Sequence, residues 1–493
     1  MKVLLINSNR FKQPWPVIPF GLSCIAAAIE RERESKVSVL DLCFSRNCAK
    51  DIRDMVKSFK PDVIGISIRN IDNAAYNTIF LLDQVRDDII TPCKKAFSGP
   101  IIIGGPAAGI SGREMLNFFD LEYAIRGDGE ACMNEFLRRL KEGASREGLQ
   151  GLIIRRSGKI LQDPAPFYVE NLDTLPFPRV YKYLDLGPYK RCDSPLQIQT
   201  KRGCGLKCTY CTYNRIEGDH YRFRSPELIA DEIETLVKDA KINHVEFTDS
   251  AFNVPIDHAK AVLRAVIKKR LNLRLRTMGL NPGYVDEELV ALMKESGFTD
   301  VDLGAESGCD ITLRSLGKNY TKKDLLKAGN LLRTRGISTT WYLLLGAPGE
   351  TRETLKETFD TITQAASRWD LINIGAGIRV YEGSPIAEGM KRENPNCTRD
   401  NFLHPVQYEP NDIGLEEIKK LTKRASFKYP NFFMYDEDET TPTFVLIVMV
   451  WVMQLFRINR PVWKVFILLR KVEMFLGIRK LKEFIWEQRG RIA

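Results

Sequence analysis

Histidine is scarce in this sequence. Only four histidines occur in 493 residues, and none precedes position 220. The start of the chain also lacks the longer apolar stretch and the small-residue cleavage site of a secretory signal. The 11 cysteines are odd in number and thinly spread outside one cluster. We therefore expect no disulfide framework, and a cytoplasmic protein.

Two further features narrow the function. No G-x-G-x-x-G fingerprint occurs, which argues against a dinucleotide site. The net charge of +10 comes mostly from the tail, because residues 441–493 hold ten Lys and Arg against three Glu. A basic excess confined to the tail does not indicate a nucleic-acid partner. The length predicts two or three domains.

The tail carries apolar stretches that are too short to span a bilayer. Residues 444–456 contain only Gln454 as a polar residue, but about 20 apolar residues are needed to cross. Basic residues separate this stretch from a second one at 465–478. We expect interfacial helices over 444–482, with the apolar side in lipid and the basic side toward anionic headgroups on the inner face of the membrane. The alternative is a helical cap packed on the barrel, with its cations snorkelling.

Residues 1–145 alternate short apolar runs with helical stretches. Strands are expected at 2–7, 36–42, 61–68, 100–105 and from 122, and helices at 19–32, 49–59, around 73–86 and up to 140. This alternation predicts a doubly wound parallel sheet, which binds ligands at the carboxyl ends of its strands. Those ends carry Asn7, Asp41, Ser67, Gly104, Gly105 and the turn from Gly127 to Glu130.

A second alternation follows a hairpin at 151–162 and a proline-rich stretch, so residues 146–194 are interpreted as hairpin and linker. Strands are expected at 196–200, 244–248, 273–277, 300–305, 338–345 and 371–379, with helices near 226–238, 257–270, 286–296, 321–334 and 351–367. Six βα units over 195–390 predict a full or partial TIM-type (β/α)6 barrel with its chemistry at the carboxyl ends of the strands. Residues 391–493 are expected to form a helical C-terminal region.

The segment KRGCGLKCTYCTYN places Cys204, Cys208 and Cys211 directly after the first barrel strand. Thiolates are soft ligands that select zinc, copper(I) or iron–sulfur clusters. A structural zinc site needs four ligands, usually as two separated pairs, and no second C-x-x-C occurs here. We therefore favour a [4Fe–4S] cluster with three cysteine-bound irons and one open iron over zinc or unligated cysteines. Gly203 and Gly205 would let the backbone wrap tightly around the cluster.

The spacing C-x3-C-x2-C, with Tyr210 before the last cysteine, resembles the signature of the radical S-adenosylmethionine (SAM) enzymes. Three later segments are similar to the same family: VEFTDSAFN (245–253), DLGAESGCDITLRSLGKNYT (302–321) and LLLGAPGETRETLKETF (343–359). The resemblance covers about 195–390. It implies that the open iron chelates SAM and that the reduced cluster cleaves SAM to a 5′-deoxyadenosyl radical.

Position by position, the resemblance also implies a SAM site. Glu306 and Ser307 would hold the methionyl or ribose portion. Asp249, and the segment from Gly346 to Glu350, would line the cavity near it, and the Tyr210 backbone would approach the adenine. The alternatives are a solvated or ion-paired carboxylate for Glu306 and a helix N-cap for Asp249.

Ahead of such a barrel, the pattern PFGL, VLDL, DVIGIS, IIIGG and RGDGE closely resembles the cobalamin-binding domain of the cobalamin-dependent radical SAM family. The resemblance implies that Ser67, Gly104, Gly105 and Gly127 contact the nucleotide tail of cobalamin; strand-end turn geometry is the alternative. Where many such domains have a cobalt-ligating histidine, this chain has Cys43. Either cobalamin binds here without a protein histidine, or the pocket has lost the ability to bind cobalamin. Cys43 itself is interpreted as a small buried hydrophobic residue.

The favoured function is a cobalamin-dependent radical SAM C-methyltransferase acting on an unactivated carbon of a small-molecule substrate, lipophilic if the tail binds a membrane. A cyclase or oxidative ring-forming enzyme on a porphyrin- or lipid-like substrate is the alternative. A cobalamin- or redox-sensing binding module ranks lowest. The resemblance implies a flavodoxin or ferredoxin as electron donor. No single residue is marked as catalytic.

Overall fold

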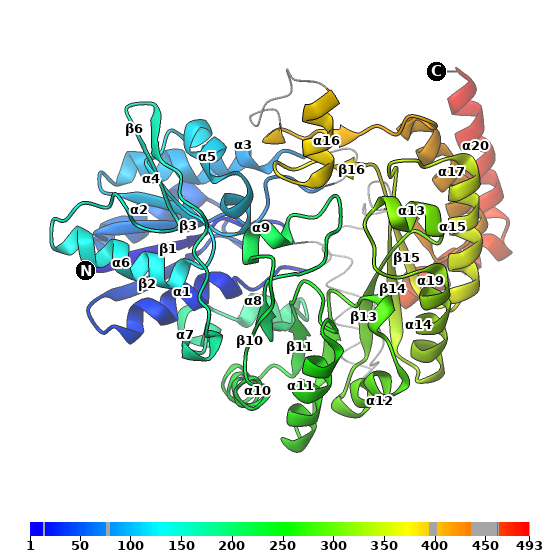
Figure 1. Cartoon of the computed structure of the whole chain (residues 1–493), viewed down its shortest axis with the longest axis horizontal. Helices are drawn as coiled ribbons and strands as arrows, with labels where there is room; N and C mark the ends of the chain where they lie inside the picture. Colours follow the sequence, from blue (N-terminus) through cyan, green and yellow to red (C-terminus); the bar gives the residue numbers. More distant parts are fainter. Residues whose placement is uncertain (13–14, 75–78, 394–401, 435–460, 462, 493) are drawn as a thin grey trace.

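The computed structural model describes residues 1–12, 15–74, 79–393, 402–434, 461 and 463–492. Two α/β domains lie side by side, the N-terminal sheet on the left of Figure 1 and the barrel on the right. The C-terminal helices lie on the outer side of the barrel, far from the N-terminal sheet (Figure 1).

The N-terminal sheet has seven strands in the order β2-β1-β3-β4-β5-β6-β7. These are β1 (Lys2–Asn7), β2 (Lys36–Asp41), β3 (Val63–Ser67), β4 (Ile101–Gly104), β5 (Tyr123–Ile125), β6 (Leu152–Arg156) and β7 (Lys159–Gln162). The first five pair in parallel, and β6 and β7 pair antiparallel. The expected hairpin is therefore present, and it extends this sheet.

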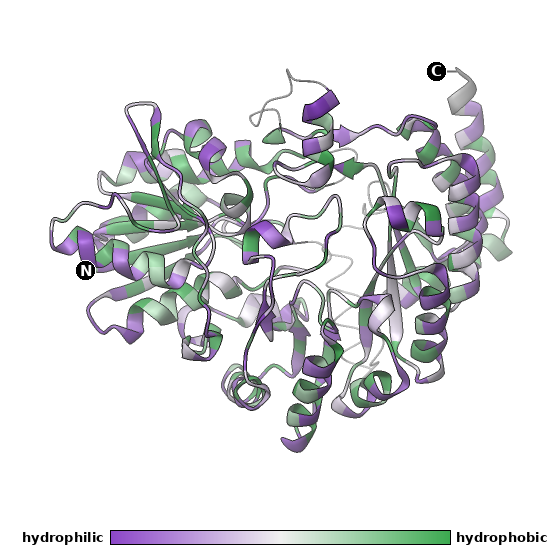
Figure 2. Ribbon diagram, in the orientation of Figure 1, coloured by the Kyte–Doolittle hydropathy of each residue, from purple (hydrophilic) through white to green (hydrophobic). Residues whose placement is uncertain are grey.

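Helices cover both faces of the N-terminal sheet, as expected of a doubly wound fold. One face carries α1 (Phe20–Arg31) and α6 (Gly129–Lys141), and the other carries α2 (Cys48–Phe59), α4 (Thr91–Ala96) and α5 (Pro106–Phe119). Side chains along β1 alternate between the two cores, Val3 and Leu5 into one, Leu4 and Ile6 into the other. Both cores are apolar, which explains the continuous green of these strands in Figure 2.

The helix expected around 73–86 is wrong in its limits. Asp72 forms an isolated bridge with Phe80, and helix α3 (Leu81–Val85) begins only after it, then continues through a π-helical turn into α4. The cause lies outside the local sequence, because the carboxylate of Asp72 accepts a 2.8 Å hydrogen bond from Arg379 of the other domain. Helix α5 was not expected at all.

Seven parallel strands form the open barrel of the second domain. They are β8 (Leu196–Ile198), β11 (His244–Phe247), β12 (Arg274–Thr277), β13 (Asp300–Glu306), β14 (Ser338–Leu345), β15 (Leu371–Ala376) and β18 (Phe432–Met434). They form two sheets, β8-β11-β12 and β13-β14-β15-β18, and bridges such as Leu280 with Leu303 join the sheets. The six expected strands are confirmed, and β18 adds a seventh from the C-terminal region.

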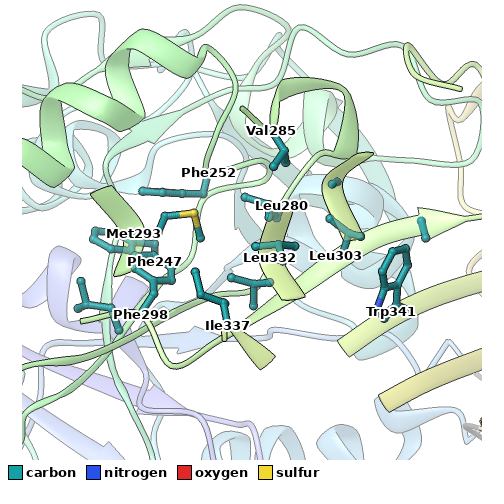
Figure 3. Close-up of a cluster of buried hydrophobic side chains, with 14 of the residues drawn as sticks. Phe247, Phe252, Leu280, Val285, Met293, Phe298, Leu303, Leu332, Ile337 and Trp341 are labelled. Carbon is teal, nitrogen blue, oxygen red and sulfur yellow. The ribbon is translucent and has the colours of Figure 1, made fainter. Parts of the chain in front are cut away.

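The barrel helices lie where the sequence places them. They are α10 (Pro226–Ala240), α11 (Ile256–Lys268), α12 (Glu287–Ser296), α14 (Lys322–Thr334) and α15 (Arg352–Ala365). Their apolar faces pack on the strands in the cluster drawn in Figure 3. In that cluster the rings of Phe247 and Phe252 stack with centroids 4.6 Å apart, and Phe298 lies within 6.0 Å of Phe247. This aromatic core fixes the strands whose ends form the site.

Buried polar contacts lock the two domains together. Arg379 Nε donates to Asp72 Oδ2 at 2.8 Å, and Tyr381 Oη donates to Asp72 Oδ1 at 2.9 Å. On the opposite edge, Tyr189 of the linker helix α8 (Gly187–Arg191) donates to Asp41 at 2.7 Å. Asp72, Arg379 and Tyr189 are almost fully buried, so these contacts form only when the two domains are docked.

The C-terminal region ends in helices α17 (Leu415–Lys428), α19 (Trp463–Phe475) and α20 (Ile478–Ile492). They pack on the outer side of the barrel, with α20 against α17 and α19 against β15. The apolar stretch 444–456 lies outside the described residues. Within the described part of the chain, no helix combines the length and the apolar character that crossing a membrane requires.

Candidate active site between the two domains

A cavity of about 580 Å³ lies where the carboxyl ends of the N-terminal strands face the barrel. All four residues predicted to contact cobalamin line its N-terminal wall: Ser67, Gly104, Gly105 and Gly127. Its barrel wall carries polar and flexible groups, namely Gln197, Gln199, Thr212, Tyr213, Thr248 and Met278. The cavity therefore brings the predicted cobalamin residues up to the barrel. None of the residues predicted to bind the cluster or SAM lines it, although Thr212 and Tyr213 directly follow the last cysteine of the loop.

The glycines of the N-terminal wall serve two purposes. A Cβ on Gly105, whose φ is +90°, would come within 2.7 Å of the Ile68 carbonyl oxygen, and one on Gly127 within 2.2 Å of the Phe167 carbonyl oxygen. These two glycines are required by the turns themselves, as the alternative interpretation held. A Cβ on Gly104 would meet no atom within 4 Å. Gly104 therefore leaves open space on the cavity wall where a ligand could approach.

Cys43 does not face this cavity. Its side chain is 1% exposed and lies in a hydrophobic cluster, where burial raises the pKa of its thiol to about 12. Asp41, two residues earlier, accepts hydrogen bonds from Asn7, Tyr189 and the Cys43 amide. The structure thus agrees with the interpretation of Cys43 as a small buried hydrophobic residue.

The turn from Gly127 to Glu130 is docked onto the barrel by arginines. Arg202 binds Glu130 at 2.7 Å and Asp128 at 3.0 Å, and Arg222 binds Asp128 at 2.5 Å. Both carboxylates are 5% exposed. Because Arg202 lies two residues before Cys204, these ion pairs fix the cysteine loop relative to the cavity wall.

The cysteine loop is shaped by close backbone contacts. Gly203 has a φ of +90°, and a Cβ there would lie 1.9 Å from the His220 carbonyl oxygen, so only glycine fits. The Cys204 amide donates to the Gly218 carbonyl at 3.0 Å, and the Cys211 amide donates to the Cys208 carbonyl at 3.3 Å. These contacts fix the backbone of the loop that carries the three cysteines.

The three thiols suit an iron–sulfur cluster. Cys204 is buried, whereas Cys208 and Cys211 are partly exposed. Burial raises the pKa of the Cys211 thiol to about 11, and ligation would deprotonate it. Among the described residues, no three His, Cys, Asp or Glu side chains converge on one metal-ion position. A cubane does not need such convergence, because each cysteine binds its own iron.

Glu306, at the end of β13, is held next to this loop. Tyr210 Oη donates to Oε1 at 2.7 Å, Tyr320 Oη donates to Oε2 at 2.7 Å, and Lys318 Nζ lies 2.9 Å from Oε1. Glu306 itself has a φ of +49°, a left-handed conformation that L-residues avoid. The carboxylate is thus ion-paired and turned toward the cysteines; its role as a SAM contact stays a prediction.

Ser307 and the turn from Gly346 to Glu350 stabilise the neighbouring strand ends. Ser307 Oγ shares a 2.7 Å hydrogen bond with Thr358 Oγ1 and accepts from the Cys309 amide. Glu350 is fully buried and accepts from the Gly346 amide at 3.2 Å and from Thr354 at 2.7 Å, while burial raises the pKa of its carboxyl. The Glu350 carboxylate therefore closes its own turn, and only the backbone of that turn is left to meet a ligand.

Asp249 is not a helix N-cap. It accepts hydrogen bonds from the Thr200 amide and hydroxyl, each at 2.7 Å, and from the Lys201 amide at 3.2 Å. Its side chain is fully buried against the Lys201 ammonium. Asp249 thus orients the segment that leads into the cysteine loop, and its predicted place on a SAM cavity stays untested.

The sequence analysis missed several groups of the site. Lys318 and Tyr320 were not singled out, although they hold Glu306. Glu217, in α9 (Tyr213–Glu217), lines the cavity; Gln199 donates to it at 2.8 Å, and burial raises the pKa of its carboxyl to about 7. The available signal was position, since Lys318 and Tyr320 lie inside the recognised segment 302–321 and Glu217 lies shortly after the cysteine loop.

Comparison with known proteins agrees with this geometry. The family model of the Radical SAM superfamily matches residues 198–362. The tryptophan 2-C-methyltransferase of Streptomyces laurentii is 25% identical, covering 88% of this chain and 82% of its own length. The anaerobic magnesium-protoporphyrin IX monomethyl ester cyclase of Rubrivivax gelatinosus is 26% identical, covering 88% and 78%.

A solved structure is similar over both domains. The radical S-adenosylmethionine methyltransferase TsrM from Kitasatospora setae, solved with cobalamin and a [4Fe–4S] cluster bound, has a TM-score of 0.71 and 27% identity; the match covers 79% of this chain and 75% of that one. A three-cysteine loop at the carboxyl end of a parallel barrel defines a radical SAM enzyme.

The barrel of this chain thus carries a Radical SAM superfamily match, and over both of its domains the chain is similar to a radical SAM methyltransferase solved with cobalamin and a [4Fe–4S] cluster. The cofactors that these similarities support are a [4Fe–4S] cluster, SAM and cobalamin.

Proposed function

We propose that the protein is a cobalamin-dependent radical SAM C-methyltransferase that methylates an unactivated carbon of a small molecule. The observation that carries the proposal is the cavity itself, which opens between the glycine-lined wall of one domain and the barrel wall of the other. Thr212 and Tyr213 of the barrel wall directly follow the cysteine loop, so a methyl donor on one wall and a radical source just behind the other would serve a single substrate space.

The three cofactors together supply hydrogen abstraction and methyl donation. Cys204, Cys208 and Cys211 would hold the cluster. The carboxylate of Glu306 would accept hydrogen bonds from the ammonium of SAM, with Tyr210 and Lys318 fixing its orientation. The open space at Gly104 would admit cobalamin. The remaining work of the chain is to orient the substrate and exclude water, because a radical intermediate must not meet other hydrogen donors.

Substrate contacts are assigned to the barrel wall. Tyr213 and Met278 are 41% and 45% exposed, and both line the cavity. Gln199 and Thr248 add hydrogen-bonding groups beside them. This combination suits a partly apolar small molecule with a few polar groups.

Anaerobic reconstitution tests the proposal. The full chain is loaded with iron, sulfide and hydroxocobalamin, and bound iron, bound cobalt, 5′-deoxyadenosine and substrate mass are measured. We expect a full cluster, one cobalamin and a mass gain of one methylene per turnover. Cys204→Ala should lose the visible iron absorption, whereas the control Cys192→Ala, a cysteine outside the loop, should keep it. Equal absorption in both variants would refute the cluster assignment.

The cobalamin wall has its own test. Gly104→Leu should fill the cavity without strain, because a Cβ at this position meets no atom within 4 Å. We expect it to lose cobalamin binding while it keeps iron and thermal stability. Gly389→Leu is the control, since its Cβ also meets open space but lies outside the cavity. Full cobalamin retention in Gly104→Leu would contradict the assignment.

A cyclase or oxidative ring-forming enzyme is the second candidate, favoured by the similarity to the protoporphyrin ester cyclase. It would use the same residues but leave the substrate without a methylene gain. A cobalamin- or redox-sensing module would release no 5′-deoxyadenosine. Product mass and 5′-deoxyadenosine therefore separate the three functions. The proposal also includes a flavodoxin or ferredoxin as electron donor. It further includes peripheral contact with a membrane through residues 444–482.

A further inference from the structure

Helices α19 and α20 form a hairpin, here called the tail hairpin (463–492), and several of its cations contact the rest of the barrel domain. Lys464 Nζ donates to Ser338 Oγ at 2.7 Å, and the Lys471 ammonium lies 3.4 Å from the centre of the Trp369 ring. Arg479 is 6% exposed and donates to the backbone of α17. The basic side of the hairpin is therefore used in intramolecular contacts and does not point to solvent as a charged stripe.

The apolar side of the tail hairpin points outward. Only Ile467 of α19 is buried. Six large apolar side chains are more than half exposed: Leu468, Leu469, Phe475, Leu476, Leu481 and Phe484. Phe475 reaches 90% exposure at the end of α19, where the chain turns into α20. A helix packed on a soluble domain normally turns its apolar side inward, so this hairpin has the opposite polarity.

From this polarity we propose that the tail hairpin inserts its turn, led by Phe475 and Leu476, into the headgroup–acyl boundary of an anionic lipid bilayer. The hairpin lies along the outer side of the barrel (Figure 1), and the apolar side chains named above remain exposed there. Lys480 is exposed beside the turn, and residues 441–493 carry a net charge of +7, from ten Lys and Arg against three Glu. This charge is complementary to anionic headgroups.

The structure revises the expected mode of binding. The basic side was expected to meet the headgroups, but most of its described cations contact the barrel. Binding should then depend chiefly on apolar insertion, with Lys480 and Lys482 adding a smaller electrostatic contribution. This inference is independent of the proposed chemistry, because no residue of the tail hairpin lines the cavity.

Vesicle sedimentation of the full chain tests the inference. The probes are vesicles of phosphatidylcholine alone and of phosphatidylcholine mixed with phosphatidylglycerol. We expect binding to the mixed vesicles, and a loss of partitioning by about tenfold or more in Phe475→Glu/Leu476→Glu. Leu161→Glu, at a site 53% exposed on the N-terminal hairpin, is the matched control and should bind like the wild type. Leu481→Glu, 59% exposed on α20, is the second variant. Thermal melting verifies that each variant folds.

Three results would overturn the inference. One is a wild-type chain that does not sediment with either vesicle. Another is undiminished sedimentation of both tail variants, which would assign lipid binding to another part of the chain. The third is that the wild type is a dimer in light scattering, and that Phe475→Glu/Leu476→Glu makes it a monomer without a change in vesicle binding. The exposed apolar side of the hairpin would then bind a second copy of the chain. Loss of binding in both tail variants, with the control unchanged, would support insertion.

Discussion

Tyr210 Oη lies 2.7 Å from Glu306 Oε1, and this hydrogen bond joins the cysteine loop to the carboxyl end of β13. Lys318 touches both partners, with its Nζ 3.0 Å from Tyr210 Oη and 2.9 Å from Glu306 Oε1. Burial together with the Glu306 carboxylate raises the pKa of the Tyr210 hydroxyl well above its usual range, so Tyr210 keeps its proton, donates it to Glu306 and accepts a hydrogen bond from Lys318. The Glu306 carboxylate, paired with the Lys318 ammonium, thus lies beside the loop predicted to hold the cluster.

Replacing that charge should weaken SAM binding without affecting the cluster. Glu306→Gln keeps the shape but loses the charge-assisted hydrogen bonds, which are worth roughly 1.5–3 kcal/mol each. We expect SAM affinity to fall by about 10- to 100-fold, measured by equilibrium binding to the reconstituted enzyme, with iron content unchanged. Glu353→Gln on exposed α15 is the control. An unchanged SAM affinity in Glu306→Gln would remove Glu306 from the SAM site.

The cysteine loop should not tolerate a side chain at Gly203. Gly203→Ala would force a Cβ to within 1.9 Å of the His220 carbonyl oxygen, so the backbone must move. We expect a loss of about 2–4 kcal/mol in the free energy of unfolding and a lower iron content after reconstitution. Gly143→Ala is the matched control, because Gly143 also has a positive φ but has open space around it. For this variant we expect a loss of about 1 kcal/mol in the free energy of unfolding. Similar losses in the two variants would show that the loop has room to adjust.

The buried pair of Arg379 and Asp72 should contribute far more than a surface pair. Arg379→Met leaves the Asp72 carboxylate buried without its cation and should cost about 3–5 kcal/mol, measured by denaturant unfolding. The exposed pair of Lys50 and Asp54 provides the comparison, where Lys50→Met should cost less than about 0.5 kcal/mol. A small loss in Arg379→Met would mean that water or another cation reaches Asp72.

The contribution of Asp302 to stability should fall as the pH rises toward 7. Three carboxylates, of Glu246, Asp300 and Asp302, surround the single guanidinium of Arg276. Burial and the repulsion among these carboxylates raise the pKa of Asp302 from 3.8 to about 7. The folded state therefore holds a proton between pH 4 and 7 that the unfolded state releases, so the stabilisation is full below about pH 4 and is lost as the pH rises through 7.

Asp302→Asn should flatten this dependence. The amide keeps the volume and removes the titration, so the free energy of unfolding should change less between pH 4 and 7 than in the wild type. Urea titrations at several pH values provide the measurement. Parallel pH profiles for the two proteins would place the retained proton on another carboxyl, such as Glu246.

Local sequence was sufficient for the strands and for the cysteine loop. Buried parallel strands are apolar on both faces, so a run such as residues 2–7 stands out without any knowledge of its neighbours. The spacing of the cysteines is likewise a property of one turn. The start of α3 could not be predicted from the local sequence. Asp72, which precedes the helix, is bound by Arg379, and Arg379 lies 307 residues further along the chain. The roles of Lys318 and Tyr320 were missed for the same kind of reason, since both depend on the path of β13.

The cavity has one wall from each of the two domains, which has a consequence for maturation. Neither domain alone can enclose the cavity, so a molecule bound there would be shielded from water only after both domains have folded and docked. Loading of the iron–sulfur loop is linked to docking through Arg202, which joins that loop to Glu130 of the other unit. Cofactor insertion during biogenesis would thus report on whether the two halves have come together correctly.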